Sequence, residues 1–209
     1  TCALPIYKVT NDDFNVYLKV TDKKNPPVDI LAKRHPSLLK GDYPAGVIWQ
    51  QAKDYCQWLG KESDKNIDLP TEAQWEYACR AGTTAPFNTG NYLTNLQANY
   101  NWAYPYNDGI NSVTTYPGMT QAVGTYPANA WGLFDMHGNV WEFTSSHWTS
   151  SHLNANRDGT PSLSANPNWY VTKGGSWFDP ATMARSAARK KRYLDEMDTN
   201  LGFRVVREL

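Results

Sequence analysis

The sequence predicts an α+β protein rich in loops, with a few helices around small twisted antiparallel sheets. Three segments before residue 83 combine helical spacing of apolar residues with capping signals. Residues 83–126 are rich in Asn, Tyr, Gly, Thr and Pro and have no helical period, and short pieces of the C-terminal third have strand character. Ordered loops are therefore expected to form more than half of the chain.

The first predicted helix follows the letters "YKVTN". Thr10 or Asn11 can cap it, and Asp12 and Asp13 place negative charge in its first turn, where the helix dipole favours it. Its apolar face consists of Phe14, Tyr17 and Leu18. The next stretch, residues 22–47, contains several prolines and is expected to be an irregular loop.

Two more helices are predicted before residue 83. One runs over about Trp49–Leu59, with Gly60 as its end. The other is capped by Thr71, with Gln74 completing a capping box, and stops at Gly82. Strand character follows in three places: Trp141–Thr144, Val171–Gly175 and Phe203–Val206.

Composition excludes some classes of function. Lys and Arg number 20, as do Asp and Glu, so no excess of positive charge indicates binding to nucleic acid. No apolar run is long enough to cross a bilayer. The 9 Trp and 13 Tyr residues are expected to fill much of the core, because a loop-rich fold has little regular structure to pack.

The opening letters "TCALPI" match the translated end of a widely used DNA-sequencing adapter. Residues 1–6 are accordingly predicted to be a non-native leader. The alternative is a native strand that begins at Ala3. Residues 7–209 are predicted to form a single domain.

Three long motifs carry a family resemblance. They are "LPTEAQWEYACRAG" at Leu69–Gly82, "WGLFDMHGNVWEF" at Trp131–Phe143, and "GGSW…RSAAR…LGFRVVRE" from Gly174 to Glu208. Their order and spacing resemble the formylglycine-generating enzyme, or sulfatase-modifying factor, domain family from about Tyr7 onward. The family pattern has an opening strand before "YEVTN". The resemblance implies a C-type-lectin-like fold, and the family includes enzymes, ligand-binding modules and proteins with no known chemistry.

The resemblance also implies a pair of copper-binding cysteines shortly after "GGS", because Cu(I) prefers soft thiolates. Residues 177–184 contain no cysteine: Asp179 stands near the first place, and Met183 and Ala184 stand near the second. Copper binding and formylglycine-generating oxidase activity are therefore predicted to be absent. Cys56 and Cys79 lie on apolar helix faces and are expected to be buried structural residues.

Calcium is the metal that the sequence predicts. The resemblance places one calcium site at Asp135, Gly138, Val140 and Glu142, which would supply carboxylate and carbonyl oxygens. A second site would use the Asn99 side chain and the Tyr100 carbonyl, with a third ligand near Thr115 or, after a shift, Asp108. The four histidines have no paired metal-ligand spacing, and His137 is expected to fix its own loop.

A ligand groove is predicted in the closing segment and in the loops around Tyr104–Gly118; its residues are Ser176, Trp177, Asp179 and Arg185. The arginines of this segment are expected mainly to lock loops to the core.

The first functional hypothesis is a non-catalytic, calcium-stabilised binding or accessory domain whose partner is a peptide, protein or glycan. The second is a divergent oxidoreductase or protein-modifying enzyme of the same family. The third is a retroelement-diversified ligand-binding protein of the C-type-lectin fold. Its variable positions would derive from Asn codons, and Lys190 and Met183 are not reachable from the usual AAC codon.

Overall fold

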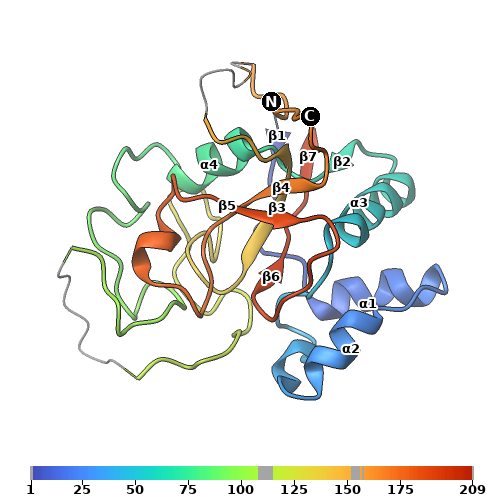
Figure 1. Cartoon of the computed structure of the whole chain (residues 1–209), viewed down its shortest axis with the longest axis horizontal. Coiled ribbons are helices and arrows are strands. Elements are labelled where there is room, and N and C mark those ends of the chain that lie inside the picture. The colour runs from blue at the N-terminus through green and yellow to red at the C-terminus, as the bar shows by residue number, and fades with distance from the viewer. Residues whose placement is uncertain (1, 108–114, 152–155, 157, 209) are drawn as a thin grey trace.

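Two small sheets lie at the centre of the computed structural model, which describes residues 2–107, 115–151, 156 and 158–208 (Figure 1). The larger sheet has the strand order β5 (Lys190–Tyr193), β4 (Trp169–Lys173), β3 (Trp141–His147), β6 (Leu201–Gly202). β3 and β6 run parallel, whereas the other pairs are antiparallel as predicted. The expected α+β class is confirmed, with one parallel pair added.

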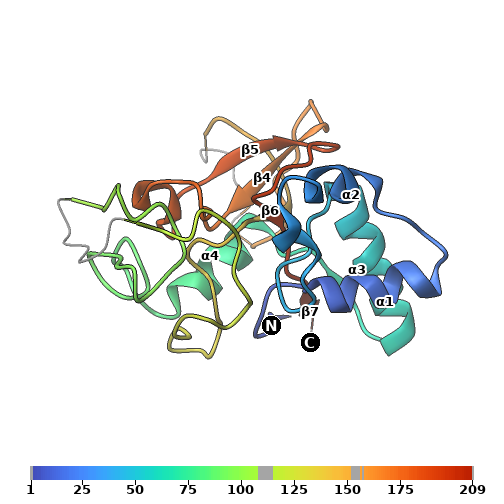
Figure 2. The same ribbon diagram turned by 90° about the horizontal axis from the view of Figure 1, so that it is seen from below.

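The smaller sheet joins the two ends of the described chain. Its strand order is β1 (Cys2–Ala3), β7 (Val206–Glu208), β2 (Ile67–Asp68), all antiparallel. Both views show the two ends side by side (Figures 1 and 2). The sequence did not predict β2, β5 or β6, because two-residue strands show no alternation and β5 has the sequence Lys-Lys-Arg-Tyr; a strand at Ala3 was only the alternative. The strand expected over Phe203–Val206 overlaps β7 only at Val206. That residues 1–6 are a leader stays a prediction.

Two of the predicted helices form as their caps indicate. α1 (Asn11–Val20) begins after Thr10, whose side chain accepts a hydrogen bond from the Asp13 amide in a capping box. α4 (Glu72–Arg80) begins after Thr71, which forms the same arrangement with Gln74. Both signals are local, so they act whatever the rest of the chain does.

The expectation of an irregular loop over residues 22–47 was wrong in part. This stretch contains the helix α2 (Pro26–Ala32) and the 3-10 helix η1 (Pro36–Leu39). Each has proline at its start, where the missing N–H costs nothing. Val28, Ala32 and Leu38 form a small buried cluster between them. α3 (Trp49–Ser63) also continues past Gly60, which lies so close to the Lys65 carbonyl that a Cβ would be only 2.9 Å away.

Helices and loops lie on opposite sides of the sheets. α1, α2 and α3 gather on one side, and the loops between α4 and β3 occupy the other side in both views (Figures 1 and 2). Within residues 83–107 and 115–126 the structure has no named helix, as predicted, but the short strands also expected in this stretch are reduced to isolated bridges at Phe87 and Asn99. In the described part of the chain, no helix is long and apolar enough to span a membrane.

The largest core cluster lies where α1 and α3 pack against the four-stranded sheet. It contains Trp141 and Phe203 together with Phe14, Tyr17 and Tyr55. Trp177, from the third motif, does not belong to this cluster. Trp177 is buried, but its indole N–H points to the Thr199 carbonyl, 3.3 Å away, and its ring contacts Phe178.

Candidate functional site

A buried group of charges lies at the centre of the second motif. We call it the Glu142 cluster; it consists of Lys8, Asp135, Glu142 and Arg204 with the indole of Trp75. Lys8 Nζ lies 2.5 Å from Glu142 Oε1 and 2.5 Å from the Asp135 carbonyl oxygen. Arg204 donates from Nε to Oε2 (2.6 Å) and from Nη2 to Oε1 (3.0 Å). Trp75 Nε1 donates to Oε2 at 2.9 Å.

The charges of this cluster are removed from water. The side chains of Lys8, Glu142 and Arg204 have no exposed surface. Burial alone raises the pKa of Glu142, but Arg204 and Lys8 outweigh it and hold the pKa at about 2. Burial lowers the pKa of Lys8, and Glu142 opposes that effect. The partners of Glu142 therefore keep its carboxylate ionised, whereas burial remains the larger effect on Lys8.

The turn of the second motif needs unusual backbone conformations. Asp135, Gly138 and Asn139 all have positive φ angles. A Cβ on Gly138 would lie 2.2 Å from the Asn99 carbonyl oxygen, so only glycine fits there. Asp135 Oδ2 accepts a hydrogen bond from the Gly124 amide at 2.7 Å, whereas its Oδ1 is buried without a partner in the described residues.

Calcium needs carboxylate and carbonyl oxygens that are free to coordinate it. Both oxygens of Glu142 already accept hydrogen bonds from the chain, and an ammonium group contacts the Asp135 carbonyl. In this arrangement Asp135, Gly138, Val140 and Glu142 do not fit a calcium ion, and calcium binding here stays a prediction. The described residues also contain no group of three or more His, Cys, Asp or Glu side chains that could hold a metal.

The second predicted calcium set fits better. Asn99 is fully buried; its Nδ2 donates to the Met119 carbonyl at 2.9 Å, and its Oδ1 has no partner in the described residues. Tyr100 is buried beside it and donates its hydroxyl hydrogen to the Leu93 carbonyl. Thr115 is exposed, and Asp108 lies outside the described residues.

Sequence reasoning missed Lys8. It assigned this residue no role, although the chain reads "YKVTN" where the family pattern reads "YEVTN". A lysine in place of a glutamate reverses a charge next to a motif that is itself rich in carboxylates. That departure from the pattern is the signal that could have identified the residue.

The residues of the predicted ligand groove are only partly brought together. Ser176 and Asp179 lie in contact, because the Ser176 hydroxyl donates a hydrogen bond to Asp179 Oδ2. Trp141 Nε1 donates to the same oxygen at 2.7 Å. Asp179 Oδ1 faces the partly exposed Lys190, whose Nζ is 3.8 Å away and lies over the Trp141 ring.

Trp177 and Arg185 do not join this group. Trp177 turns toward Thr199, and Arg185 Nε donates to the Thr182 carbonyl in the 3-10 helix η2 (Ala181–Ala184). The side chain next to Asp179 that does reach the surface is Phe178, which is 60% exposed. Tyr104, with 61% exposure, lies close by, since its carbonyl accepts the Ala181 amide.

His137 fixes its loop, as the sequence indicated. It is buried, Nε2 accepts a hydrogen bond from the Asn88 amide at 3.0 Å, and Nδ1 therefore donates to the Ala184 carbonyl at 2.7 Å. Both ring nitrogens are thus used by the neutral form. Cys56 and Cys79 are buried free thiols, as expected, and burial raises the pKa of Cys79 to about 12, so it is no thiolate at neutral pH.

Acidification should destabilise the protein through His137. Burial lowers its pKa from 6.5 to about 4, so between these values the unfolded chain binds a proton that the folded chain does not. Neutral His137 therefore contributes to the free energy of unfolding, and this contribution is complete above pH 6.5. It falls by about 3 kcal/mol as the pH is lowered toward 4. Urea unfolding at several pH values should show this loss, and His137→Gln should have a shallower pH dependence. Equal slopes for the two proteins over this range would contradict the assignment.

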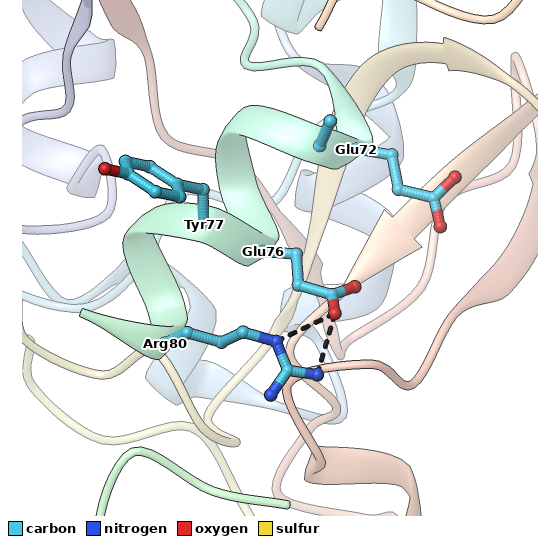
Figure 3. Close-up of a pocket in the computed structure, with 5 residues that line it drawn as sticks. Glu72, Glu76, Tyr77 and Arg80 are labelled. Carbon is cyan, nitrogen blue, oxygen red and sulfur yellow. Dashed lines mark hydrogen bonds and ion pairs between the residues drawn. The ribbon is translucent and has the colours of Figure 1, made fainter. Parts of the chain in front are cut away.

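The remaining arginines bind the closing segment to the core, as expected. Arg189 pairs with Glu72 of α4 at 2.8 Å, whereas Arg192 pairs with Glu196 within the closing segment itself. Glu72 and Glu76 also line a pocket of about 410 Å³ along α4, together with Ala73, Tyr77 and Arg80 (Figure 3). In Figure 3 the ring of Tyr77 lies on the other side of the helix from the carboxylates. Glu76 is paired with Arg80 at 2.8 Å and Lys173 at 3.0 Å, so this carboxylate is already neutralised.

Curated relatives share the motifs described above. The chain is 34% identical over 184 residues to formylglycine-generating enzyme of Mus musculus, covering 82% of this chain and 47% of that protein. It is 32% identical over 164 residues to inactive C-alpha-formylglycine-generating enzyme 2 of Bos taurus, covering 76% of this chain and 48% of that protein. The chain thus spans about half the length of these relatives.

Solved structures agree in fold. The structure of PvdO from Pseudomonas aeruginosa has a TM-score of 0.80 at 28% identity, covering all of this chain and 80% of that one. The U1 variant of the major tropism determinant is similar with a TM-score of 0.50 at 14% identity, covering 98% of this chain and 50% of that one; this shows a C-type-lectin-like fold alone. The model of the sulfatase-modifying factor enzyme 1-like domain matches residues 2–209. The chain therefore belongs to the formylglycine-generating enzyme (sulfatase-modifying factor) domain family, as a member without the copper-binding cysteine pair.

Proposed function

We propose that the chain is a non-catalytic binding or accessory domain of this family. It binds a peptide, protein or glycan at the surface formed by Phe178, Asp179, Lys190 and Tyr104. The similarity to a relative named inactive C-alpha-formylglycine-generating enzyme 2 supports this proposal.

One structural observation is the main support for a non-catalytic binding domain. After Gly174-Gly175-Ser176, where the family resemblance implies thiolates for copper, the chain has a carboxylate fixed by the Ser176 hydroxyl and the Trp141 indole N–H. A carboxylate in this setting neither binds Cu(I) as a thiolate pair does nor activates Ser176 as a nucleophile toward a Cys peptide. It can hold a hydrogen-bond donor of a ligand, with the exposed ring of Phe178 beside it.

We propose calcium binding only at the second predicted set of ligands, Asn99 and Tyr100. The buried Oδ1 of Asn99, which has no partner in the described residues, supports a cation beside Asn99 and Tyr100. Bound there, calcium would coordinate the orphaned amide oxygen and tie the loop of Asn99 to the turn at Gly138, with which Asn99 forms an isolated bridge.

The purified protein should not convert a sulfatase-type Cys peptide to formylglycine, with or without added copper. No thiolate pair follows "GGS" to hold and cycle the metal. Mass spectrometry of the peptide measures the product. Aldehyde above the level of a no-protein control would contradict the non-catalytic proposal.

Binding is tested on peptide and glycan arrays with the labelled protein. Phe178→Ala and Asp179→Asn should each lower the signal of any bound probe about tenfold, because truncating a central aromatic contact costs more than about 1 kcal/mol. Leu163→Ala is the matched control, since Leu163 is also exposed but lies outside this surface. Equal binding by all four proteins would place the ligand elsewhere, and an empty array would count against a peptide or glycan partner.

A further inference from the structure

We infer that the ammonium group of Lys8 is the resident cation of the Glu142 cluster and takes the place of the calcium ion that the family resemblance implies. Lys8 Nζ lies 2.5 Å from one of the oxygens proposed to bind such an ion, Glu142 Oε1, and 2.5 Å from the backbone carbonyl of Asp135, whose carboxylate is another proposed ligand. An ion and this ammonium group cannot share that position.

The formal charges balance without a metal. Lys8 and Arg204 carry two formal positive charges, and two carboxyl groups lie near them: Glu142, which is paired with both, and Asp135, whose pKa is raised by burial. A divalent cation added to this group would leave a buried excess of positive charge, which is costly in a region without water. Without Lys8, two carboxylates would face a single guanidinium, and a cation would be favoured.

The backbone fixes Lys8 in this position. Its neighbour Val9 donates its amide to the Phe203 carbonyl at 3.0 Å and accepts from the Ala45 amide at 2.9 Å. The segment is thus held next to the C-terminal motif, and Lys8 is only 1% exposed. The ammonium group is therefore a built part of the core and not a mobile side chain that an ion could displace at little cost.

Removing the amine should open a cation site. Lys8→Ala would leave a space bordered by Glu142 Oε1 and the Asp135 carbonyl, and Asp135 Oδ1 is already without a partner. Such hard oxygens suit calcium and its luminescent substitute terbium. Lys8→Met is the matched control, because it removes the charge but keeps most of the side-chain volume.

The experiment measures terbium luminescence, excited through tryptophan, and the melting temperature with calcium or a chelator. Trp75 donates to Glu142 and would sensitise an ion bound there. Wild type and Asp135→Asn should respond alike, because neither holds an ion in the cluster; asparagine tolerates the positive φ of this position. A metal ion bound near Asn99 would give the same luminescence and the same melting shift in wild type and in Asp135→Asn, so it does not affect the comparison of these two proteins.

Lys8→Ala should melt roughly 10 °C below wild type in chelator, since it removes one of the two cations that pair with the buried Glu142 carboxylate. Calcium at about one hundred times its Kd should raise that temperature by about 5 °C or more, and terbium should luminesce. Lys8→Met and Lys8→Ala/Asp135→Asn should show neither effect. If Lys8→Ala folds only when calcium is present, the inference is supported in the same way.

Two results would overturn the inference. One is a calcium or terbium response of the wild-type protein that Asp135→Asn reduces. The other is a folded Lys8→Ala protein that responds to neither ion. If Lys8→Ala is insoluble under all conditions, the comparison of wild type with Asp135→Asn decides alone: equal responses support the inference, and a reduced response overturns it.

Discussion

Replacing Glu142 with alanine should make the protein insoluble or leave it without fixed tertiary structure. The substitution removes the only carboxylate that contacts Lys8 and Arg204 among the described residues, and it leaves two buried cations with only the more distant Asp135 carboxyl group beside them. Breaking one buried pair costs about 3–5 kcal/mol, and here two are broken together. The total stability of a domain is only about 5–15 kcal/mol. Soluble yield, near-UV circular dichroism and urea unfolding measure the effect.

The matched control is Asp54→Ala. Asp54 also pairs with a lysine, Lys23, at 2.7 Å, but its side chain is 29% exposed and that of Lys23 is 48% exposed. Water and salt screen such a pair, so its loss should cost at most about 1 kcal/mol. If the Glu142 and Asp54 variants were destabilised equally, the cluster would contribute no more than an exposed pair.

Trp141→Ala is expected to have the second-largest effect. Trp141 is fully buried in the main core cluster, and its indole N–H holds the Asp179 carboxylate at 2.7 Å. Truncating a buried tryptophan costs about 3–5 kcal/mol, and the loss of one of the two hydrogen-bond donors to Asp179 Oδ2 adds to that cost. Urea unfolding followed by far-UV circular dichroism should show a lower midpoint or no cooperative transition.

Trp131→Ala serves for comparison, because it removes the same side chain from the surface. Trp131 is 48% exposed and stacks at an angle against Tyr77, with ring centroids 5.0 Å apart. Its loss should cost about 1 kcal/mol or less. A Trp141 variant as stable as the Trp131 variant would show that the core tolerates the cavity.

What the sequence could predict was mostly local. Thr10 and Thr71 mark helix starts through hydrogen bonds to residues three positions on, and these signals are complete within one turn. α2 was missed because its prolines were read as breakers, although proline at a helix start favours the helix. The parallel pairing of β6 with β3 depends on how distant segments meet, which no local pattern encodes.

In the candidate functional site, too, local contacts could be predicted and long-range contacts could not. Ser176 and Asp179 are three residues apart, and their contact follows from a short turn that the motif itself contains. Trp177 and Arg185 are near them in sequence, yet each turns toward a different neighbour. Lys8 contacts Glu142 across 134 residues, so its role is visible only in the folded molecule or in its departure from the family pattern.

The three charged side chains of the Glu142 cluster also determine when the domain can acquire its full stability during synthesis. Glu142 follows Lys8 by 134 residues, and Arg204 follows Glu142 by another 62. At about 5–20 residues per second, the ribosome needs on the order of ten to forty seconds to supply all three. Until Arg204 has emerged from the ribosome, the Glu142 carboxylate of the nascent chain lacks one of its two cationic partners. The charge pairing of this cluster therefore cannot be completed before Arg204 has left the ribosome.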